Sequence, residues 1–509
     1  MYQREELPQP QSMVRRRVTG TLTTESPMHI GDGDRVRVKG RDCESKFLDA
    51  ADPEYSTVAT DCDGKPIIPG TAIKGALLAW ALAHGYRDAD GYPDALVKAV
   101  FGTMEGGGIV TFHDARLQDC VKPVGPEYRL WSDKRSTALS PQVAINPRTR
   151  SADEHLLYYV EYVPAGATFE VRCTMQGASD AQLGLLLDAL ENAFASRERP
   201  ARLGGDVSNG WGKMRWKFGE LLGMDPRAWL DGPLKPWHEA LLAVVPPARE
   251  KWAGHGPIAP VLLRLTLDFQ GAMLINDPSR QRKGDQPIGH ASIRKEDGKV
   301  YLPAQSVRGA FRAQARRIWQ TLAWDNERQD LNLTRHMDAR RKGDVPELAA
   351  FLKLFGATGW RAPIEVEDFQ LEGAEKPPHV QEFVAVDRFT GGAAAGKKFN
   401  AHGLWRPKFT GTIQIRVDRL ENEKLDAGEW VWMLLAYTLR DWMEGDGMIG
   451  FGASKGYGAF RASVKVDGDG EAARTLRGVL GRDAAGLESA ELDRWAQSLE
   501  RVLEVREVA

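Results

Sequence analysis

The 509-residue chain contains one sequence pattern twice, and this duplication constrains its fold more than any other feature. The stretch GKPIIPGTAIKGALLAW begins at Gly64, and GKVYLPAQSVRGAFRAQ begins with the same layout at Gly298. In both copies Asp-Gly separates two short apolar runs, which is the strongest local signal for a β-hairpin, and a helix start follows directly. Internal repeats of this kind predict two copies of one structural unit.

Three further blocks recur in the same order. They pair VFGTMEGGGIVTFHDARL with LFGATGWRAPIEVEDFQL, VAINPRTR with VAVDRFTG, and GGDVSNGWGKMRW with GFGASKGYGAFRA. Four blocks in register predict repeat units at residues 14–222 and 258–466. A linker rich in proline and glycine is expected at 223–257, and an amphipathic helical tail at 467–509 is expected to pack on its own chain.

Within each unit, apolar periodicity predicts a strand, a hairpin, a helix, two further strands, a second helix, a glycine-rich loop and a last strand. Strand-helix-strand, repeated, is the split βαβ arrangement of the ferredoxin-like fold, so we expect an α+β protein with two such domains. RNA-recognition folds commonly use this scaffold, although a fold by itself does not give a function.

Composition excludes several classes of protein. The chain is 42% hydrophobic and 27% charged, and it has no apolar run near the ~18 residues that span a bilayer. With no apolar signal segment near the N-terminus, we expect a cytoplasmic protein with no membrane partner. Four scattered cysteines favour neither a disulfide framework nor a structural zinc site. A net charge of -2 excludes a uniformly basic nucleic-acid binder, so binding would depend on local clusters.

Several motifs together resemble the RAMP superfamily of CRISPR-associated proteins. They are MHIGDGD, PIIPGTAIKGAL, VFG followed by FHDA, and LGGDVSNGWGK. More narrowly they resemble the backbone subunits of type III effector complexes, and two units in one chain resemble the tandem backbone fusion of type III-D systems. The resemblance implies a modified RNA-recognition-motif fold whose repeats stack along a guide RNA, each with a thumb hairpin that wedges into the guide-target duplex. It also implies three kinds of partner, namely crRNA, target RNA and other type III effector subunits.

Basic residues at the two helix starts are candidate RNA ligands. Lys74 and Arg308 occupy the same offset in the first helical turn, where free N–H groups and the helix dipole favour an anion, so each is predicted to contact a phosphate. Arg308, Arg312 and Arg316 continue as a stripe at i, i+4 and i+8. Because like charges at that spacing repel, the stripe is either an anion-binding face or a solvated one.

Two loop types supply further RNA-binding candidates. In GDGDRVRVKGR, an extended chain presents Arg35, Arg37 and Lys39 on one face, suited to following a phosphate backbone, although a mobile solvated loop fits equally. The glycine-rich loops lack the Gly-Lys-Ser/Thr ending of a P-loop and are predicted to approach RNA closely. Their candidate residues are Gly210, Gly212, Gly456 and Gly458. The aromatic residues of these loops, Trp211 and Tyr457, are expected mainly in the core.

The thumb candidates are the stretches NPRTRSADEHLLYYVEY and DRFTGGAAAGKKFNAH. Their cations are predicted RNA ligands, namely Arg148, Arg388, Lys397 and Lys398. Phe389 and Phe399 are candidate apolar wedges. The second stretch is rich in glycine and alanine, so it is either a loop without contacts or a segment that orders on duplex RNA.

The resemblance further implies that an aspartate preceding each thumb cuts the target RNA with a divalent metal and leaves a cyclic phosphate. The matching positions are Tyr55 and a site near Gly289 or His290, none of which is acidic. Among the flanking acids, Asp52 and, after it, Asp285 are the candidate catalytic and metal-binding residues, with Mg²⁺ or Mn²⁺ as the cofactor.

Two rival functions remain open. The missing aspartate match favours a non-catalytic RNA-binding scaffold whose neighbours do the cutting. A metal-independent nuclease that processes the guide would instead need a histidine or tyrosine base. The three histidines considered, His29, His113 and His290, are isolated and are expected to be structural. Asp32 and Asp34 are expected to form turns.

Overall fold

A computed structural model describes most of the chain. The described residues are 15–37, 54–122, 130–145, 152–195, 200–224, 229–230, 232, 236, 239–246, 259–277, 280, 287–295, 297–322, 350–356, 360–420, 429–481 and 489–504. Among them, no helix is both long enough and apolar enough to cross a membrane.

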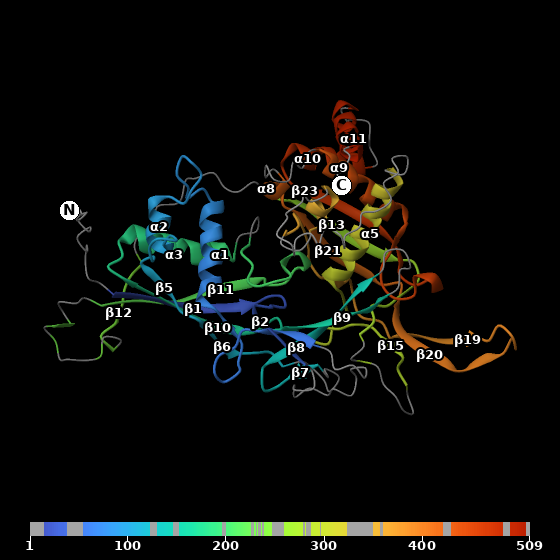
Figure 1. Ribbon diagram of the computed structural model, residues 1–509, viewed down its shortest axis with the longest axis horizontal. Helices are drawn as coiled ribbons and strands as arrows, with labels where there is room; N and C mark the ends of the chain where they lie inside the picture. The colour runs from blue at the N-terminus through green and yellow to red at the C-terminus, as the bar shows by residue number, and fades with distance from the viewer. Residues whose placement is uncertain are drawn as a thin grey trace.

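The first repeat is built on a seven-stranded sheet with helices on one face (Figure 1). Its strands are β1 (Arg15–Thr24), β4 (Ile67–Ile68), β5 (Val110–Phe112), β6 (Ala115–Asp119), β10 (Thr168–Gln176), β11 (Met214–Met224) and β12 (Leu242–Ala243). Its helices are α1 (Gly70–Ala83), α2 (Ala95–Phe101) and α3 (Asp180–Ala193). The order β11-β1-β10-β6 is that of a ferredoxin-like sheet, in which the first and third strands are central. Strand β12 comes from the stretch expected to be linker and extends this sheet.

The second repeat has the same order of its four central strands. Its strands are β13 (Val261–Phe269), β16 (Tyr301–Leu302), β17 (Ile364–Val366), β18 (Phe369–Leu371), β21 (Lys408–Ile415), β22 (Gly447–Met448) and β23 (Ala459–Asp467). Its helices are α5 (Ala304–Leu322), α7 (Ala350–Phe355), α8 (Val417–Leu420) and α9 (Trp430–Glu444). The order β18-β21-β13-β23 matches that of the first repeat, so the expected α+β fold with two ferredoxin-like domains is confirmed.

Each repeat carries a second sheet that holds its thumb hairpin. In the first repeat it contains β2 (Gly31–Arg37), β3 (Glu54–Val58), β7 (Trp131–Ser132), β8 (Thr137–Ile145) and β9 (Ala152–Tyr162). In the second it contains β14 (Ala272–Met273), β15 (His290–Ala291), β19 (His379–Val386) and β20 (Ala393–Trp405). The β19–β20 hairpin projects from the body of the protein (Figure 1). Both expected thumbs are therefore antiparallel hairpins.

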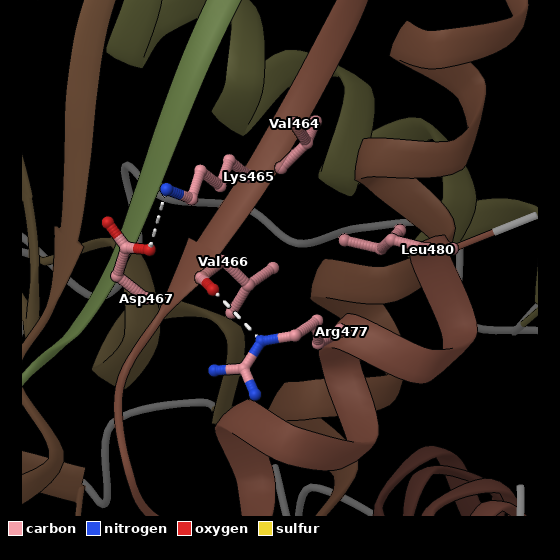
Figure 2. A pocket seen from close by; sticks show the side chains of 7 residues that line it. Val464, Lys465, Val466, Asp467, Arg477 and Leu480 are labelled. Carbon is pink, nitrogen blue, oxygen red and sulfur yellow. Dashed lines mark hydrogen bonds and ion pairs between the residues drawn. The ribbon is translucent and has the colours of Figure 1, made fainter.

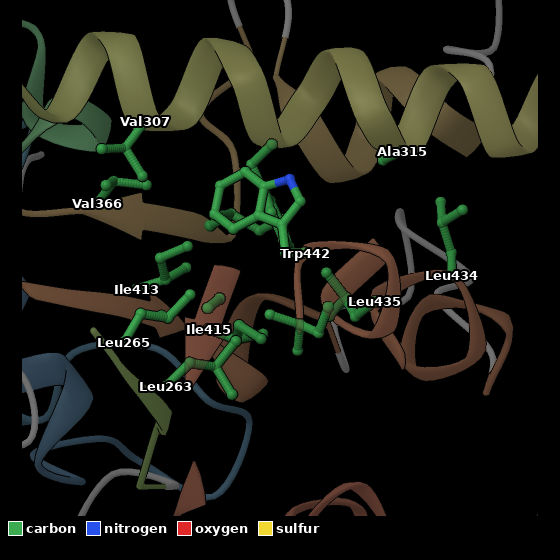
Figure 3. Packing of buried hydrophobic residues seen from close by; sticks show 14 of the residues in the cluster. Leu263, Leu265, Val307, Ala315, Val366, Ile413, Ile415, Leu434, Leu435 and Trp442 are labelled. Carbon is green, nitrogen blue, oxygen red and sulfur yellow. The ribbon is translucent and has the colours of Figure 1, made fainter. Parts of the chain in front are cut away.

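Each repeat has its own core between the large sheet and its helices. In the second repeat, Leu263 and Leu265 of β13 and Ile413 of β21 lie beneath α5 and α9 (Figure 3). The ring of Trp442 is 1% exposed and meets Phe311 edge-on at 5.1 Å. Burying an aromatic side chain of this size contributes about 3 kcal/mol. The alternating burial of β13 follows from its apolar-polar sequence pattern.

The C-terminal tail adds two helices to the second repeat, α10 (Glu471–Leu480) and α11 (Ser489–Glu504). Trp495 and Leu499 of α11 are 2% and 3% exposed and belong to the core that also contains α9. The expectation that the tail packs on its own chain is confirmed. Its apolar residues recur at helical spacing because one face of the helix is buried.

Candidate nucleic-acid interface

The two helix starts are built identically. The hairpins preceding them turn at Gly64 and Gly298, which have φ of 75° and 80°. An aspartate from the following strand region then accepts a hydrogen bond from the first backbone N–H of each helix: Asp114 from Gly70 (2.8 Å) and Asp368 from Ala304 (3.0 Å). The anion at each positive helix end is thus a carboxylate of the chain itself. The sequence contains a signal for these caps, because His113-Asp114 and Glu367-Asp368 align in the second repeated block. Sequence reasoning nevertheless did not identify the two aspartates as caps.

The paired cations Lys74 and Arg308 have different surroundings. Lys74 is half-buried, and its ammonium makes no ion pair with any residue that the structure describes. The Arg308 guanidinium donates to the carbonyl oxygen of Phe355 at 2.6 Å. Burial lowers the pKa of Arg308, and the nearby Asp206 carboxylate of the first repeat partly offsets this effect. Arg308 therefore takes part in a contact between the repeats, and its predicted phosphate contact stays a prediction.

The arginine stripe on α5 is confirmed as a run of three neighbouring, half-buried cations. Burial, together with the neighbouring Arg308 and Arg316, lowers the pKa of Arg312 to about 10. No carboxylate of the described residues offsets this effect on Arg312. The predicted anion-binding role of Arg312 stays a prediction.

The glycine-rich loops pack against their own chain. Gly212 and Gly458 both have positive φ, and a Cβ there would lie 2.1 Å from the carbonyl oxygen of Leu203 or Ile449. Their N–H groups donate to Pro27 and Ala272, which follow the first strand of each repeat, at 2.8 Å in both cases. These two glycines are required by a close backbone approach within the repeat. Their contact with RNA was a prediction and stays one.

The loop aromatics are buried as expected. Trp211 is 6% exposed and packs on the ring of Tyr162 at 5.5 Å. Tyr457 is 2% exposed and donates its hydroxyl hydrogen to Gln381 on the thumb at 2.7 Å. Each aromatic residue therefore fixes its glycine-rich loop to the base of its own thumb.

The first glycine-rich loop also docks on the second repeat. We call residues 202–213 the docking loop; they include the short helix η3 (Val207–Asn209). The side-chain amide of Gln305 donates to Asp206 at 3.0 Å, and Arg202 lies 3.5 Å from Glu367. A Cβ on Gly210 would lie 2.8 Å from the carbonyl oxygen of Val366. This contact holds the two repeats together, and sequence reasoning missed it.

Cations of the first thumb sheet lie on an edge strand. Among the described strands, β2 pairs with β3 alone, and all seven of its residues are exposed. Arg35 and Arg37 form no ion pair within the described part of the chain. The expectation of an extended segment that carries both is confirmed, whereas Lys39 lies outside the described residues. The aligned Arg280 of the second repeat donates to the carbonyl oxygen of Ser292 at 2.9 Å instead.

The second thumb exposes cations at its tip and along β20. Arg388 and Lys397 are exposed without an ion pair among the described residues, while Lys398 lies 3.5 Å from Glu382. Phe389 at the turn is fully exposed, as a wedge requires. Phe399 instead stacks on Phe383 at 5.0 Å, about midway along the hairpin. In the first thumb, Arg148 lies outside the described residues.

A buried ion pair supports the base of the first thumb. The Glu161 side chain on β9 is fully buried and accepts two hydrogen bonds from the Arg135 guanidinium, at 2.8 and 2.9 Å. It also accepts from the Thr137 hydroxyl and from the backbone N–H of Val58 on β3. Four donors for one carboxylate make this a structural link between β3, β8 and β9. Sequence reasoning missed it because 26 residues separate the charged partners.

The acid candidates for catalysis, Asp52 and Asp285, lie outside the described residues. The positions that match the implied aspartate are Tyr55, whose side chain is buried, and Gly289 or His290. Within the described ranges, no group of three or more His, Cys, Asp or Glu side chains converges. Asp32 and Asp34, expected to form turns, instead lie within strand β2, at the irregularity in its pairing between Gly31 and Arg35. Asp32 accepts from the Thr57 hydroxyl at 2.5 Å and from the N–H of Asp34.

A shallow hollow of about 310 Å³ lies between β23 and α10 (Figure 2). Its polar groups already have partners. Arg477 donates to the carbonyl oxygens of Val466 and Gly468, and Lys465 lies 3.8 Å from Asp467. The hollow therefore joins the tail to the sheet and offers no free charge for a ligand.

Two tandem ferredoxin-like repeats, each with a thumb hairpin and a glycine-rich loop, define a repeat protein on the RNA-recognition scaffold. The profile of the family described as the RAMP superfamily matches residues 21–215 and 287–461. These segments cover more than half of the chain, so the chain belongs to the RAMP superfamily. Membership implies a CRISPR-associated protein that binds crRNA, the guide RNA. No curated protein sequence matches the chain.

Proposed function

We propose that this protein is a backbone subunit of a type III CRISPR effector, with two backbone repeats fused in one chain as in type III-D systems. It binds crRNA, holds the guide-target duplex with its two thumbs and assembles with other effector subunits in the cytoplasm. The family match in both halves supports the tandem arrangement.

The observation that carries this proposal is the set of exposed cations on the thumb sheets that form no ion pair with any described residue. Arg35 and Arg37 lie on β2, the edge strand of the first thumb sheet among the described residues, and Arg388 and Lys397 lie on the second thumb. Clustered cations without carboxylate partners attract a phosphate backbone, and they do so even when the net charge of the protein is near zero. In the first half the cations lie in the same sheet as the thumb hairpin, one strand away from it, and in the second half they lie on the hairpin itself.

Guide binding is tested with a guide-length single-stranded RNA and the double variant Arg35→Ala/Arg37→Ala. Removing two phosphate contacts should raise the Kd and reduce the slope of log K against log salt by about 1.4. Arg474→Ala is the matched control, because this exposed arginine lies on α10, away from both thumbs. Equal slopes for the double variant and the control would exclude the β2 edge from RNA binding.

We further propose that at least one repeat cuts target RNA, with Asp52 the first candidate and Asp285 the second. Strands β3 and β15, which follow these residues, pair in parallel with the thumb strands β9 and β20. The segments that carry both acids therefore lead directly into the thumb bases, where a displaced target nucleotide would lie. Carboxylate oxygens suit Mg²⁺ or Mn²⁺, which would stabilise the charge that develops at the cleaved phosphate.

Cleavage is tested in the assembled effector with Mg²⁺ and a matched target RNA. If both repeats are active, Asp52→Ala and Asp285→Ala should each remove one specific product. The alternative is a non-catalytic scaffold whose neighbours cut the target, which the buried Tyr55 at the matching position favours. An unchanged product ladder with both variants would establish that alternative.

A further inference from the structure

The contact between the repeats joins a loop of the first repeat to a surface of the second. By sequence alignment, each repeat has both a loop and a surface of this kind. One half of this contact is the docking loop around Asp206. The other is the docking surface on the second repeat, formed by Gln305, Arg308, Val366 and Glu367. By the alignment of the repeats, a second docking surface lies on the first repeat, and a second docking loop lies on the second repeat, at residues 448–459. The residues of the first-repeat surface are Thr71, Lys74, Phe112 and His113.

No described residue covers the second docking loop in the way that the second repeat covers the first. Ser454, Lys455 and Gly456 are exposed, whereas the aligned residues of the first loop are buried or half-buried. A Cβ on Gly456 would meet no atom within 4 Å, although its φ of 80° equals that of Gly210. The burial of the first loop is therefore caused by docking and not by the fold of the loop itself.

The two free halves do not match each other. At the position of Asp206, which supplies the carboxylate, the second loop has Gly452. At the position of Arg202, which lies near Glu367, the second loop has Met448. The second loop also has Lys455 at the position of Asn209, whose side chain donates to Asp206. A second copy seated in the same way would lose the carboxylate contact and bring Lys455 toward Lys74, and like charges brought together cost binding energy.

We propose that the first-repeat docking surface binds the glycine-rich loop of a different protein, one that places a carboxylate at the position taken by Asp206 in the internal contact. The chain does not bind a second copy of itself there. This inference rests on the proposed function only in assuming that the chain works beside other subunits.

The chemistry of the surface sets the chemistry of its partner. In the internal contact, the carboxylate accepts from Gln305 and faces Arg308. The aligned donors on the first repeat are the Thr71 hydroxyl and the Lys74 ammonium, which has no ion pair within the described residues. Burial and the nearby Arg172 lower the pKa of His113, so at neutral pH it presents no charge where Glu367 attracts Arg202. The partner loop therefore needs an acid and does not need the arginine.

The test gives the second loop the acid that it lacks. The full-length Gly452→Asp/Lys455→Asn variant copies two residues of the first loop, and aspartate is tolerated at the left-handed backbone that Asp206 also adopts. Sedimentation velocity on nuclease-treated protein should give the wild type the mass of one chain, 56.4 kDa, at all concentrations. The variant should reach the mass of two or more chains as its concentration rises, and adding Lys74→Glu should return it to one.

Three results would overturn the inference. In the first, wild-type chains associate and Lys74→Glu abolishes their association. In the second, the Gly452→Asp/Lys455→Asn variant stays at the mass of one chain, and in the third its association survives the addition of Lys74→Glu. Guide-RNA binding is measured separately on the same proteins. Its failure would refute the proposed function and leave the sedimentation result standing.

Discussion

Asp206 in the first repeat accepts a hydrogen bond from the side-chain amide of Gln305 in the second repeat, 99 positions later, at 3.0 Å. Asp206 has a left-handed backbone with φ of 57°, and its loop enters the contact as part of a rigid turn. The two repeats are therefore joined by a specific polar contact as well as by the covalent chain.

Gly210→Ala should weaken this contact, and Gly456→Ala is its control. Both glycines have φ of 80°, so each alanine costs about 1 kcal/mol in backbone strain. Only the Gly210→Ala methyl group meets the Val366 carbonyl, which should add about 1 to 3 kcal/mol. Urea unfolding of the two variants measures the difference. Equal losses of stability would mean that the loop does not dock in solution.

Arg135→Ala should destabilise the first repeat by about 3 kcal/mol, because it leaves the Glu161 carboxylate buried without its ion-pair partner. Glu161→Gln in the same background should recover part of the loss, since an amide is less costly to bury than a charge. A double-mutant cycle by chemical unfolding measures both values. Arg215→Ala is the control, because its exposed pair with Glu25 at 3.8 Å should contribute no more than about 0.5 kcal/mol.

Cysteine labelling should distinguish Cys62 from Cys173. Burial raises the pKa of the Cys173 thiol to about 12, so it stays protonated and shielded at pH 8, whereas Cys62 is exposed. Native protein treated with iodoacetamide should be modified at Cys62 and not at Cys173, as read by peptide mass spectrometry. Unfolded protein should react at both sites. Above pH ~8.5 unfolded thiols ionise while Cys173 does not, so this group lowers stability as pH rises.

Trp495→Ala should destabilise the second repeat by about 3 kcal/mol, because the indole of α11 is buried in the core that includes α9. Arg501→Ala on the exposed face of the same helix should change stability by less than about 0.5 kcal/mol. Thermal unfolding followed by circular dichroism measures both. Similar midpoints for the two variants would show that the tail is not part of the core.

The sequence was sufficient for the features that depend on local pattern. The Asp-Gly hairpins, the helix starts and the buried loop aromatics each depend on residues close together in the chain. Because each feature occurs in both repeats, each copy supported the prediction made for the other. The order β11-β1-β10-β6 also follows, because the split βαβ pattern leaves few topologies.

Features that depend on distant residues could not be predicted. The Glu161 and Arg135 pair forms only when the thumb sheet brings the two together, and Arg308 comes near the Asp206 carboxylate only when the two repeats pack together. Phe399 was predicted as an apolar wedge from its place in the thumb sequence. Its ring packs on Phe383 instead, because the register of β19 and β20 places the two residues opposite each other.

The most direct test of the central claim is photo-crosslinking of the purified protein with bound guide RNA, followed by peptide mass spectrometry. Because the same RNA-binding unit is built twice, crosslinked peptides should fall in both repeats, including β2 in the first and the β19–β20 hairpin in the second. Crosslinks confined to one repeat, or a protein that retains no guide RNA, would contradict the account.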